Sequence, residues 1–342
     1  FEEQWHCTPA LDLGALSDPG LTLVETGDMK SGDQPSVSVV IPTFNRVDSL
    51  CRVLPSYLRS PSETRPSAVS EVIVVDDAGT DGTEERVRRL MAGEPRLRYT
   101  RNRENLGAPA TRNRGALLAR GVWVLQGEDD LALGEGYVET VLDHALRTGA
   151  DVIAGRRIWM RLGETEEQAL VRANRSRAPL VHERRLDVNS HAITPGDVEV
   201  PLLSAIMLVR REVFDRVQYD PQFGGPSSWR EESDFQLCAL ESGYKLVFCP
   251  HAMAFHHSRA SQSYGGRRLK GTAMYAYRIY HNNLVFLRRH QDYLRAHLPR
   301  ALLFGSPLAS ALRYGLYRTA WLLAVELLRA WRARKHGAFS WE

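Results

Sequence analysis

Three of the strands that the sequence predicts end in groups of polar side chains. The first strand ends in Pro42-Thr43-Phe44-Asn45-Arg46, the second in Asp76-Asp77, and the fourth is followed by Glu128-Asp129-Asp130. One such group alone would be explained as a turn or a helix cap. In an open parallel sheet, however, the carboxyl ends of the strands meet at one edge, where ligands bind. Three polar strand ends therefore predict a binding site at that edge.

Carboxylates dominate these groups, and no cysteine is among them. Oxygen ligands without thiolates match a hard cation such as Mg²⁺ or Mn²⁺, which would in turn hold phosphate oxygens. Further carboxylates open a predicted helix in the segment WREESDF at 229–235, and His256-His257 follows two short predicted strands. The carboxylates and the histidine pair also have purely structural explanations. Acidic residues favour a helix N-terminus, and a histidine is often only part of the packed interior or the surface.

The elements that position these groups alternate between short apolar runs and amphipathic segments. We expect strands at 36–42, 71–75, 97–101, 121–126, 151–154, 203–210, 245–248 and 252–255. We expect helices at 48–59, from a cap at 81–83 to about 91, and at 108–120, 136–147 and 231–242. This alternation predicts an α/β fold, a mostly parallel sheet with helices on both faces. Residues 156–199 are polar and Arg-rich, and we expect an irregular insertion beside the site there.

The composition is that of an ordinary folded protein. Hydrophobic residues make up 43% and charged residues 25% of the 342, which excludes disordered, collagen-like and small disulfide-stapled classes. The cysteines Cys7, Cys51, Cys238 and Cys249 lie far apart without CxxC spacing, so neither a zinc ribbon nor a disulfide framework is indicated. Reduced thiols and the absence of a signal-peptide pattern before residue 36 lead us to expect a cytoplasmic protein.

Charge is distributed unevenly along the chain. Residues 258–342 carry 15 Lys and Arg against 3 Asp and Glu, a net charge of +12, whereas residues 1–257 carry −9. We therefore expect a division into an N-terminal extension (1–35), a catalytic domain (36–257) and a basic helical extension (258–342). The helical patterns at 272–297 and 308–335 contain no run near the ~20 apolar residues that span a bilayer.

Two interpretations of the basic extension remain open. Its Trp- and Leu-containing amphipathic helices suit peripheral contact with an anionic inner membrane face. They equally suit a helical cap or a homodimer interface. No nucleic-acid partner is expected, because no recognised DNA- or RNA-binding module is present. The dinucleotide-binding GxGxxG after the first strand and the P-loop GxxxxGK[ST] are also absent from the sequence.

The ordered motifs resemble those of glycosyltransferase family 2. They are VSVVIPTFNR, EVIVVDDAGTDGT, NLGAPATRNRG, GEDD, WREESDF and FHH, and they cover roughly residues 36–257. The resemblance implies a GT-A, Rossmann-like fold and inverting transfer of a sugar from a UDP-, dTDP- or GDP-sugar to an acceptor hydroxyl. It also implies a divalent cation, Mn²⁺ or Mg²⁺. The acceptor stays open among a lipid-linked glycan, a polysaccharide and a small natural product.

The resemblance also implies roles for residues that match the family motifs. The catalytic pair maps onto Glu231-Glu232, with Glu232 as the general base where the family has Asp. The metal motif Asp-x-Asp maps onto 128–130 with Glu in first place, so Asp130 is expected as the main ligand, joined by Glu128 and by His256 rather than His257. Contacts with the nucleotide sugar are expected from Pro42, Thr43, Asn45, Arg46, Asp76, Asp77, Gly107, Arg112, Asn113, Glu128, Asp129, Trp229, Arg267 and Arg268.

Three features of the sequence bear on alternatives to this assignment. The loop SQSYGGRRLK at 261–270, with Arg267 and Arg268, is expected to close over the diphosphate, the alternative being a solvated hinge. A nucleotidylyltransferase would need a Gly-rich basic loop after the first strand, which is absent. A non-catalytic nucleotide-sugar-binding scaffold is favoured only by Glu128 and Glu232 standing where the family has Asp.

Overall fold

The computed structural model describes residues 35–59, 67–176, 178–224, 229–257 and 273–317. These fall into two compact units, a larger one with residues 35–182 and 186–257 and a smaller one with residues 183–185 and 273–317. The predicted extension before residue 35 and the predicted lid at 261–270 lie outside the described residues. The expected three-part division therefore stays a prediction.

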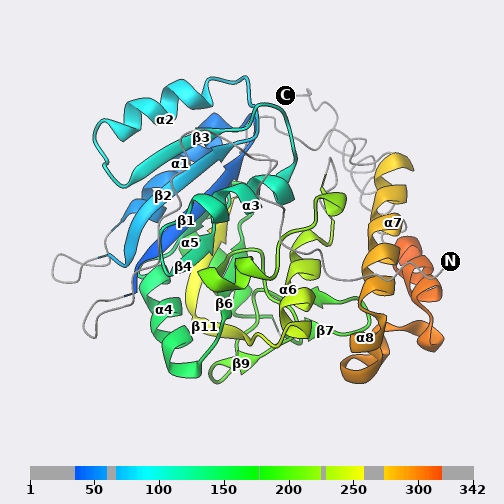
Figure 1. Ribbon diagram of the computed structural model, residues 1–342. Coiled ribbons are helices and arrows are strands. Elements are labelled where there is room, and N and C mark those ends of the chain that lie inside the picture. Colours follow the sequence, from blue (N-terminus) through cyan, green and yellow to red (C-terminus); the bar gives the residue numbers. More distant parts are fainter. Residues whose placement is uncertain (1–34, 60–66, 177, 225–228, 258–272, 318–342) are drawn as a thin grey trace, which may run out of the picture. The chain divides into compact units, whose positions relative to one another are not determined.

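The larger unit is built on a mixed, mostly parallel sheet (Figure 1). Its strands run in the order β3-β2-β1-β4-β10-β6-β11-β5, and β9 pairs with β11. Only β10, β5 and β9 are antiparallel to their neighbours among these strands of the described chain. The strands are β1 (Val37–Thr43), β2 (Val69–Asp76), β3 (Leu97–Arg101), β4 (Trp123–Gln126), β5 (Leu131–Leu133), β6 (Val152–Trp159), β9 (Val198–Glu199), β10 (Met207–Arg210) and β11 (Leu246–His256). A separate two-stranded ribbon pairs β7 (Val181–His182) with β8 (Asp187–Val188).

Helices cover both faces of this sheet, as the alternation of strands and helices predicts. Side chains along β1 point to opposite faces, so Val39 and Ile41 enter the apolar core beneath α1 and α4, while Val40 enters the core beneath α3 and α6. The helices of the larger unit are α1 (Val47–Leu58), α2 (Thr83–Met91), α3 (Ala108–Leu118), α4 (Tyr137–Thr148), α5 (Glu166–Ala173) and α6 (Glu231–Glu241).

Helix α3 lies against β1 closely enough to require glycine. A Cβ atom added at Gly115 would come within 2.1 Å of Cγ1 of Val40, so any side chain there would push the helix off the sheet. This contact explains the glycine that closes the segment NLGAPATRNRG. It also holds the start of α3 beside the polar strand ends.

The structure corrects three local predictions. Residues 156–199 are not irregular throughout, because β6 continues to Trp159 by pairing with β11, and α5 begins with a capping box between Thr165 and Gln168. The two strands expected at 245–248 and 252–255 are one strand, β11, with a register irregularity between Phe248 and Met253. The strand expected at 203–210 begins only at Met207.

The smaller unit is helical where it is described. The pattern at 272–297 forms two helices, α7 (Ala273–Arg289) and α8 (Gln291–His297), and helical backbone also spans 307–317. In the described part of the chain, no helix combines the length and the apolar character needed to cross a membrane.

Candidate functional site

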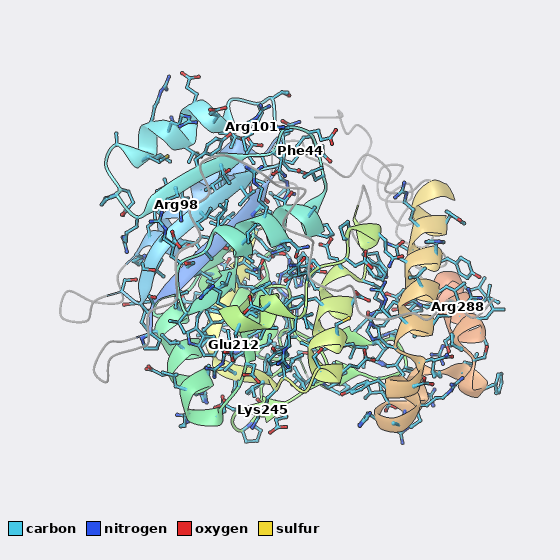
Figure 2. All side chains as sticks on the ribbon, viewed as in Figure 1. Phe44, Arg98, Arg101, Glu212, Lys245 and Arg288 are labelled. Atoms are coloured by element: carbon cyan, nitrogen blue, oxygen red, sulfur yellow. The ribbon has the colours of Figure 1, made fainter. Side chains whose placement is uncertain are left out.

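Hydrogen bonds tie together the loops that follow β1 and β2. Oδ1 of Asn45 accepts from the backbone N–H of Thr80 at 2.6 Å, and Oδ2 of Asp81 accepts from that of Val47 at 2.8 Å. Asn45 and Ala78 have φ values of 53° and 64°, a left-handed conformation that is costly for residues other than glycine. Figure 2 labels Phe44, just after β1, and Arg101, at the end of β3, toward the same upper edge of the sheet.

Asp76 is the last residue of β2, Asp77 follows it, and both are buried. The Asp76 carboxylate accepts from the N–H of Gly79 and from the Tyr99 hydroxyl, each at 2.7 Å. Asp77 accepts from the backbone N–H groups of Leu106 and Gly107 at 2.8 Å. Asp77 thus holds the loop that leads into α3, and its expected contact with a nucleotide stays a prediction.

Arg112 and Asn113 project from α3. The Asn113 amide exchanges two hydrogen bonds with the backbone of Tyr219, at 2.7 and 2.9 Å, and so fixes that segment against the helix. The buried Arg112 donates to the carbonyl of Gly127 at 3.2 Å. Nη2 of Arg112 also lies 3.9 Å from the carboxylate of Glu128, the first of the acidic residues that follow β4.

Asp129 and Asp130 share one guanidinium. Nη1 of Arg46 lies 2.7 Å from Oδ1 of Asp129 and 2.9 Å from Oδ2 of Asp130, and the Thr43 hydroxyl donates to Asp129 at 2.9 Å. Burial raises the pKa of Asp129 to about 6. Burial acts in the same direction on Asp130, but His256 and Arg46 outweigh it and lower the pKa of Asp130 to about 2. Asp130 is therefore the more firmly ionised of the two.

Strand pairing brings His256 to Asp130. β11 runs antiparallel to β5 with His256 opposite Leu131, and the N–H of His257 donates to the Asp130 carbonyl at 2.9 Å. In this register, Nε2 of His256 lies 3.3 Å from Oδ1 of Asp130. Burial and the nearby Arg157 lower the pKa of His256 to about 4, so its imidazole is neutral at neutral pH, as metal ligation requires.

Glu128 completes a group of three possible metal ligands. One ligand atom from each of Glu128, Asp130 and His256 lies within 4.8 Å of the others. The backbone N–H and C=O of Glu128 are both bonded to the Tyr57 hydroxyl at 3.1 Å, which fixes the chain at this point. Arg157 contacts the Glu128 carboxylate at 2.8 Å.

The predicted catalytic pair opens α6. Glu231 is buried and Glu232 is partly exposed, and both follow Arg230, whose φ of 74° turns the chain into the helix. Burial disfavours the charge of Arg112, but Tyr219, Glu232 and Glu231 outweigh that effect and raise the pKa of the guanidinium. The helix pair and the residues after β4 therefore act on the same arginine.

The predicted donor-binding set has three further members, Trp229, Arg267 and Arg268. Trp229 precedes Arg230 and is partly buried. Arg267 and Arg268 lie outside the described residues.

Comparison with known proteins identifies the family. The family model described as glycosyl transferase family 2 matches residues 38–217, more than half of the chain. The chain belongs to glycosyl transferase family 2. The family and the GT-A fold predicted from the sequence are thereby confirmed.

Individual family members are similar over shorter stretches. Glycosyltransferase AglE of Haloferax volcanii is 29% identical over 121 residues, 35% of this chain and 39% of that protein. Validoxylamine A glucosyltransferase of Streptomyces hygroscopicus subsp. jinggangensis is 38% identical over 125 residues, 35% of this chain and 28% of that protein. The matches thus span between about a quarter and two fifths of these relatives.

A solved glycosyltransferase structure supports the fold alone. The crystal structure of GalNAc-T7 with UDP, GalNAc and Mn²⁺ superposes with a TM-score of 0.52 and 16% identity. The superposition covers 76% of this chain and 51% of that one.

The donor atoms at this family 2 site suit a divalent cation. Among the described residues, Arg46, Arg112 and Arg157 each lie within 4 Å of at least one of the carboxylates Glu128, Asp129 and Asp130. Glu231 and Glu232 are two further carboxylates that act on Arg112. Carboxylate oxygens with a neutral imidazole are donors that such ions accept.

Sequence reasoning missed Arg157 and Trp159. The Arg157 guanidinium lies 4.6 Å from the centre of the Trp159 ring, and that ring lies 4.0 Å from the His256 ring. Arg157 therefore links Glu128 to the histidine side of the site. The available signal was that Arg156-Arg157 follows a predicted strand directly, as polar groups follow the other strands at this edge.

Proposed function

We propose that this protein transfers a sugar, with inversion, from a nucleotide-diphosphate donor to an acceptor hydroxyl in the presence of Mn²⁺ or Mg²⁺. The observation that carries the proposal is the group of Glu128, Asp130 and His256 within 4.8 Å, flanked by Arg46 and Arg157. An ion held by these three residues would neutralise negative charge on the diphosphate leaving group.

The arginines of the site have a matching role. Arg46 and Arg157 each lie within 3 Å of a carboxylate of the proposed ligand group, so both are positioned before substrate arrives. A guanidinium that is already oriented loses little conformational entropy when it contacts phosphate oxygens. We assign them to the donor diphosphate, together with the buried Arg112.

Glu232 is the proposed general base. Glu231 and Glu232 share the first turn of α6, but Glu231 is almost fully buried whereas Glu232 is partly exposed. Only a carboxylate that substrate can reach removes a proton from an attacking hydroxyl. The difference in exposure supports Glu232 rather than Glu231, and Glu231 then maintains the charge of Arg112.

The donor is a UDP-, dTDP- or GDP-sugar in this proposal, with Pro42 and Asp76 at the strand ends and Asn45 and Gly107 in the loops around the nucleotide. The acceptor is a lipid-linked glycan, a polysaccharide or a small natural product. The 38% identity to validoxylamine A glucosyltransferase supports the last of these. Parallel assays with the three acceptor classes separate them.

An exposed apolar stripe on the helical segment 307–317 supports contact between the smaller unit and a partner. Leu308, Leu312 and Leu316 recur every four residues and are exposed, so they form one apolar stripe. With the basic charge of residues 258–342, this stripe supports peripheral membrane contact, and a homodimer is the alternative. Co-sedimentation with anionic vesicles is expected for the first, and a concentration-dependent mass in solution for the second.

The proposed function is tested by donor binding and product stereochemistry. UDP, dTDP and GDP are screened by thermal unfolding with and without Mn²⁺, since a ligand that binds only the folded state raises its stability. We expect one diphosphate to stabilise the protein only with metal. Proton NMR of the product formed from the matching sugar should then show the inverted anomer. Metal-dependent binding without turnover on any acceptor class would favour the scaffold alternative, and retention of configuration would contradict the proposal.

A further inference from the structure

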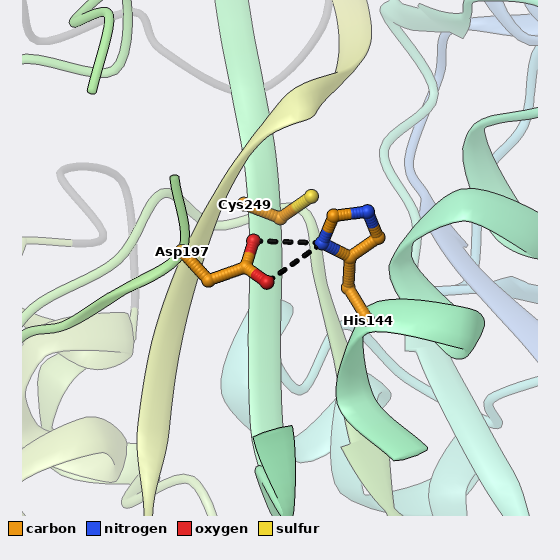
Figure 3. Close-up of side chains that lie close together, drawn as sticks. All are labelled: His144, Asp197 and Cys249. Atoms are coloured by element: carbon orange, nitrogen blue, oxygen red, sulfur yellow. Dashed lines mark hydrogen bonds and ion pairs between the residues drawn. The ribbon is translucent and has the colours of Figure 1, made fainter. Parts of the chain in front are cut away.

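A second group of metal-ligating side chains lies apart from the site described above. Figure 3 shows His144, Asp197 and Cys249 converging, and one ligand atom from each lies within 4.8 Å of the others. Nδ1 of His144 is 2.7 Å from both carboxylate oxygens of Asp197. His144 belongs to α4, Asp197 directly precedes β9, and Cys249 belongs to β11, so three separate segments meet here.

The backbone around Cys249 suits a metal-bound thiolate. Cys249 is fully buried, and the backbone N–H groups of His251 and Ala252, two and three residues further along β11, act to lower the pKa of its thiol. These donors are available because β11 leaves its register with β6 between Phe248 and Met253. Backbone N–H groups aimed at a sulfur stabilise its negative charge. Without a cation, burial raises the pKa of the Cys249 thiol, so an ion would have to displace its proton.

We propose that His144, Asp197 and Cys249 bind one Zn²⁺ ion in a structural site separate from the glycosyl-transfer site. A thiolate, an imidazole and a carboxylate form a mixed donor set that zinc accepts, whereas Mg²⁺ prefers oxygen alone. Tetrahedral zinc with bonds of ~2.0–2.3 Å places its ligand atoms about 3.3–3.8 Å apart. The observed separations therefore need to change by only about 1 Å.

Neighbouring groups are compatible with this ion. The ring of the exposed His251 lies 5.1 Å from that of His144, within reach as a fourth ligand. Nη2 of Arg147 lies 2.9 Å from Asp197 and 2.7 Å from Nδ1 of His144, but the Arg147 side chain is 63% exposed and can turn to solvent when the cation replaces it. The thiolate and the carboxylate together match the two charges of the ion.

The proposed zinc would fasten the segment that leads to β9 onto the sheet. β9 is a two-residue edge strand whose two residues are both exposed, so it is anchored weakly by itself. His256 of the first site lies seven residues further along β11, roughly 20 Å at the rise of a strand. The two sites are therefore independent in their ligands, and the zinc proposal does not rest on the proposed function.

Cobalt spectroscopy of the full, reduced and chelator-treated chain tests the proposal. Co²⁺ replaces Zn²⁺ in such sites, and a thiolate ligand adds a charge-transfer band in the near ultraviolet. The first site contains only nitrogen and oxygen donors and cannot produce this band. We expect one equivalent of Co²⁺ to produce the band, and Zn²⁺ to remove it by displacement. A folded wild-type protein that shows no band would overturn the proposal.

Variants assign the band to these residues. Cys249→Ser should abolish it, while the matched Cys51→Ser, on α1, and Asp130→Asn should retain it. If Cys249→Ser does not fold, as judged by circular dichroism, Asp197→Asn and His144→Gln decide. Each should weaken cobalt affinity by at least about tenfold. A band that survives in folded Cys249→Ser, or an affinity unchanged in both other variants, contradicts the assignment.

Discussion

The amino and carboxyl edges of the main sheet differ in the partners of their buried carboxylates. At the amino edge, Glu71 on β2 is buried, and its carboxylate accepts from the Ser38 hydroxyl at 2.6 Å and from the N–H of Arg120 at 2.7 Å, with Arg98 as its ion-pair partner. At the carboxyl edge, Asp129 and Asp130 share one guanidinium. The amino edge thus pairs one buried carboxylate with its own donors, whereas at the carboxyl edge two neighbouring carboxylates depend on a single arginine.

The two edges also differ in backbone conformation, and the strained residues lie near the carboxyl edge. Among the described residues, five other than glycine have positive φ, and three of these, Asn45, Ala78 and Arg230, lie in the segments that border the candidate site. Strain of this kind costs about 1–3 kcal/mol per residue and persists only where the surrounding structure holds it. The bonds at the amino edge thus stabilise the fold, whereas the carboxyl edge holds its charged groups in place at a cost in stability.

The largest expected effect is on turnover at the carboxyl edge. Glu232→Gln should lower turnover by about 10²–10⁴-fold, because the amide cannot accept the proton of the acceptor hydroxyl. Donor affinity should stay nearly unchanged, since the base contacts the acceptor. Steady-state kinetics with calorimetric donor binding measure both quantities. Glu241→Gln, at the other end of the same helix, serves as the control. A loss of donor affinity as large as the loss of turnover would argue against the assignment.

At the amino edge, the expected effect is on stability. Glu71→Gln should lower the free energy of unfolding at neutral pH by about 1–3 kcal/mol, because buried donors lose a charged acceptor. Burial by itself would raise the pKa of Glu71, but the bonds from Ser38 and Arg120 hold it below the ordinary value of 4.5. The stabilisation is thus present above pH 4.5 and lost as the pH falls through the lower folded value.

Urea unfolding across the acid range measures this dependence. The difference in unfolding free energy between Glu71→Gln and wild type should close as the pH falls from 4.5 through the lower folded-state pKa of Glu71. The exposed Glu84→Gln should cost less than about 0.5 kcal/mol. A gap that stays constant with pH would show that the Glu71 charge is not what stabilises this edge.

Asp129 should show the opposite dependence on pH. Its pKa is raised from 3.8 to about 6, so in the metal-free protein its stabilising protonated form is present below pH 3.8 and lost as the pH rises through about 6. Asp129→Asn removes the titrating carboxyl group, so this variant should not lose stability as the pH rises. Between pH 3.8 and about 6, its free energy of unfolding should increase by about 1–3 kcal/mol relative to that of wild type. Urea unfolding in chelator tests it, and parallel curves for the two proteins would disprove it.

The smallest effect is expected from relieving backbone strain. Ala78→Gly should raise the free energy of unfolding by less than about 1 kcal/mol, since relief of ~1–2 kcal/mol of left-handed strain is offset by the entropy of glycine in the unfolded chain. Ala92→Gly, at a residue with φ of −62°, should instead lower stability. Equal losses in both variants would show that the loop after β2 stores no strain.

Most of this fold could be predicted because its signals are local. The observed β1, β3, α1 and α4 all lie within a few residues of their expected positions. The polar strand ends gathered at one edge as the parallel topology requires. Gly115 has a similarly direct cause, its contact with Val40.

What escaped prediction depends on contacts between distant segments. Arg157 lies on a strand only because β6 pairs with β11 and its charge meets Glu128. The pairing of His256 with Asp130 was expected only from the family resemblance, because it depends on the antiparallel pairing of β11 with β5, which no local pattern encodes. His144 and Cys249 are about a hundred residues apart in sequence, so spacing rules for metal ligands could not connect them.

The most direct test of the account compares nucleotide binding by variants of the two edges. Isothermal titration measures the affinity for the preferred nucleoside diphosphate, with and without Mn²⁺, in wild type, Asp130→Asn and Glu71→Gln. We predict that Mn²⁺ strengthens binding in wild type and in folded Glu71→Gln, and that Asp130→Asn, with its fold verified by circular dichroism, loses this metal-dependent gain. A metal-dependent gain that survives in Asp130→Asn would contradict the account, because the carboxyl edge would then not be where the metal and the diphosphate meet.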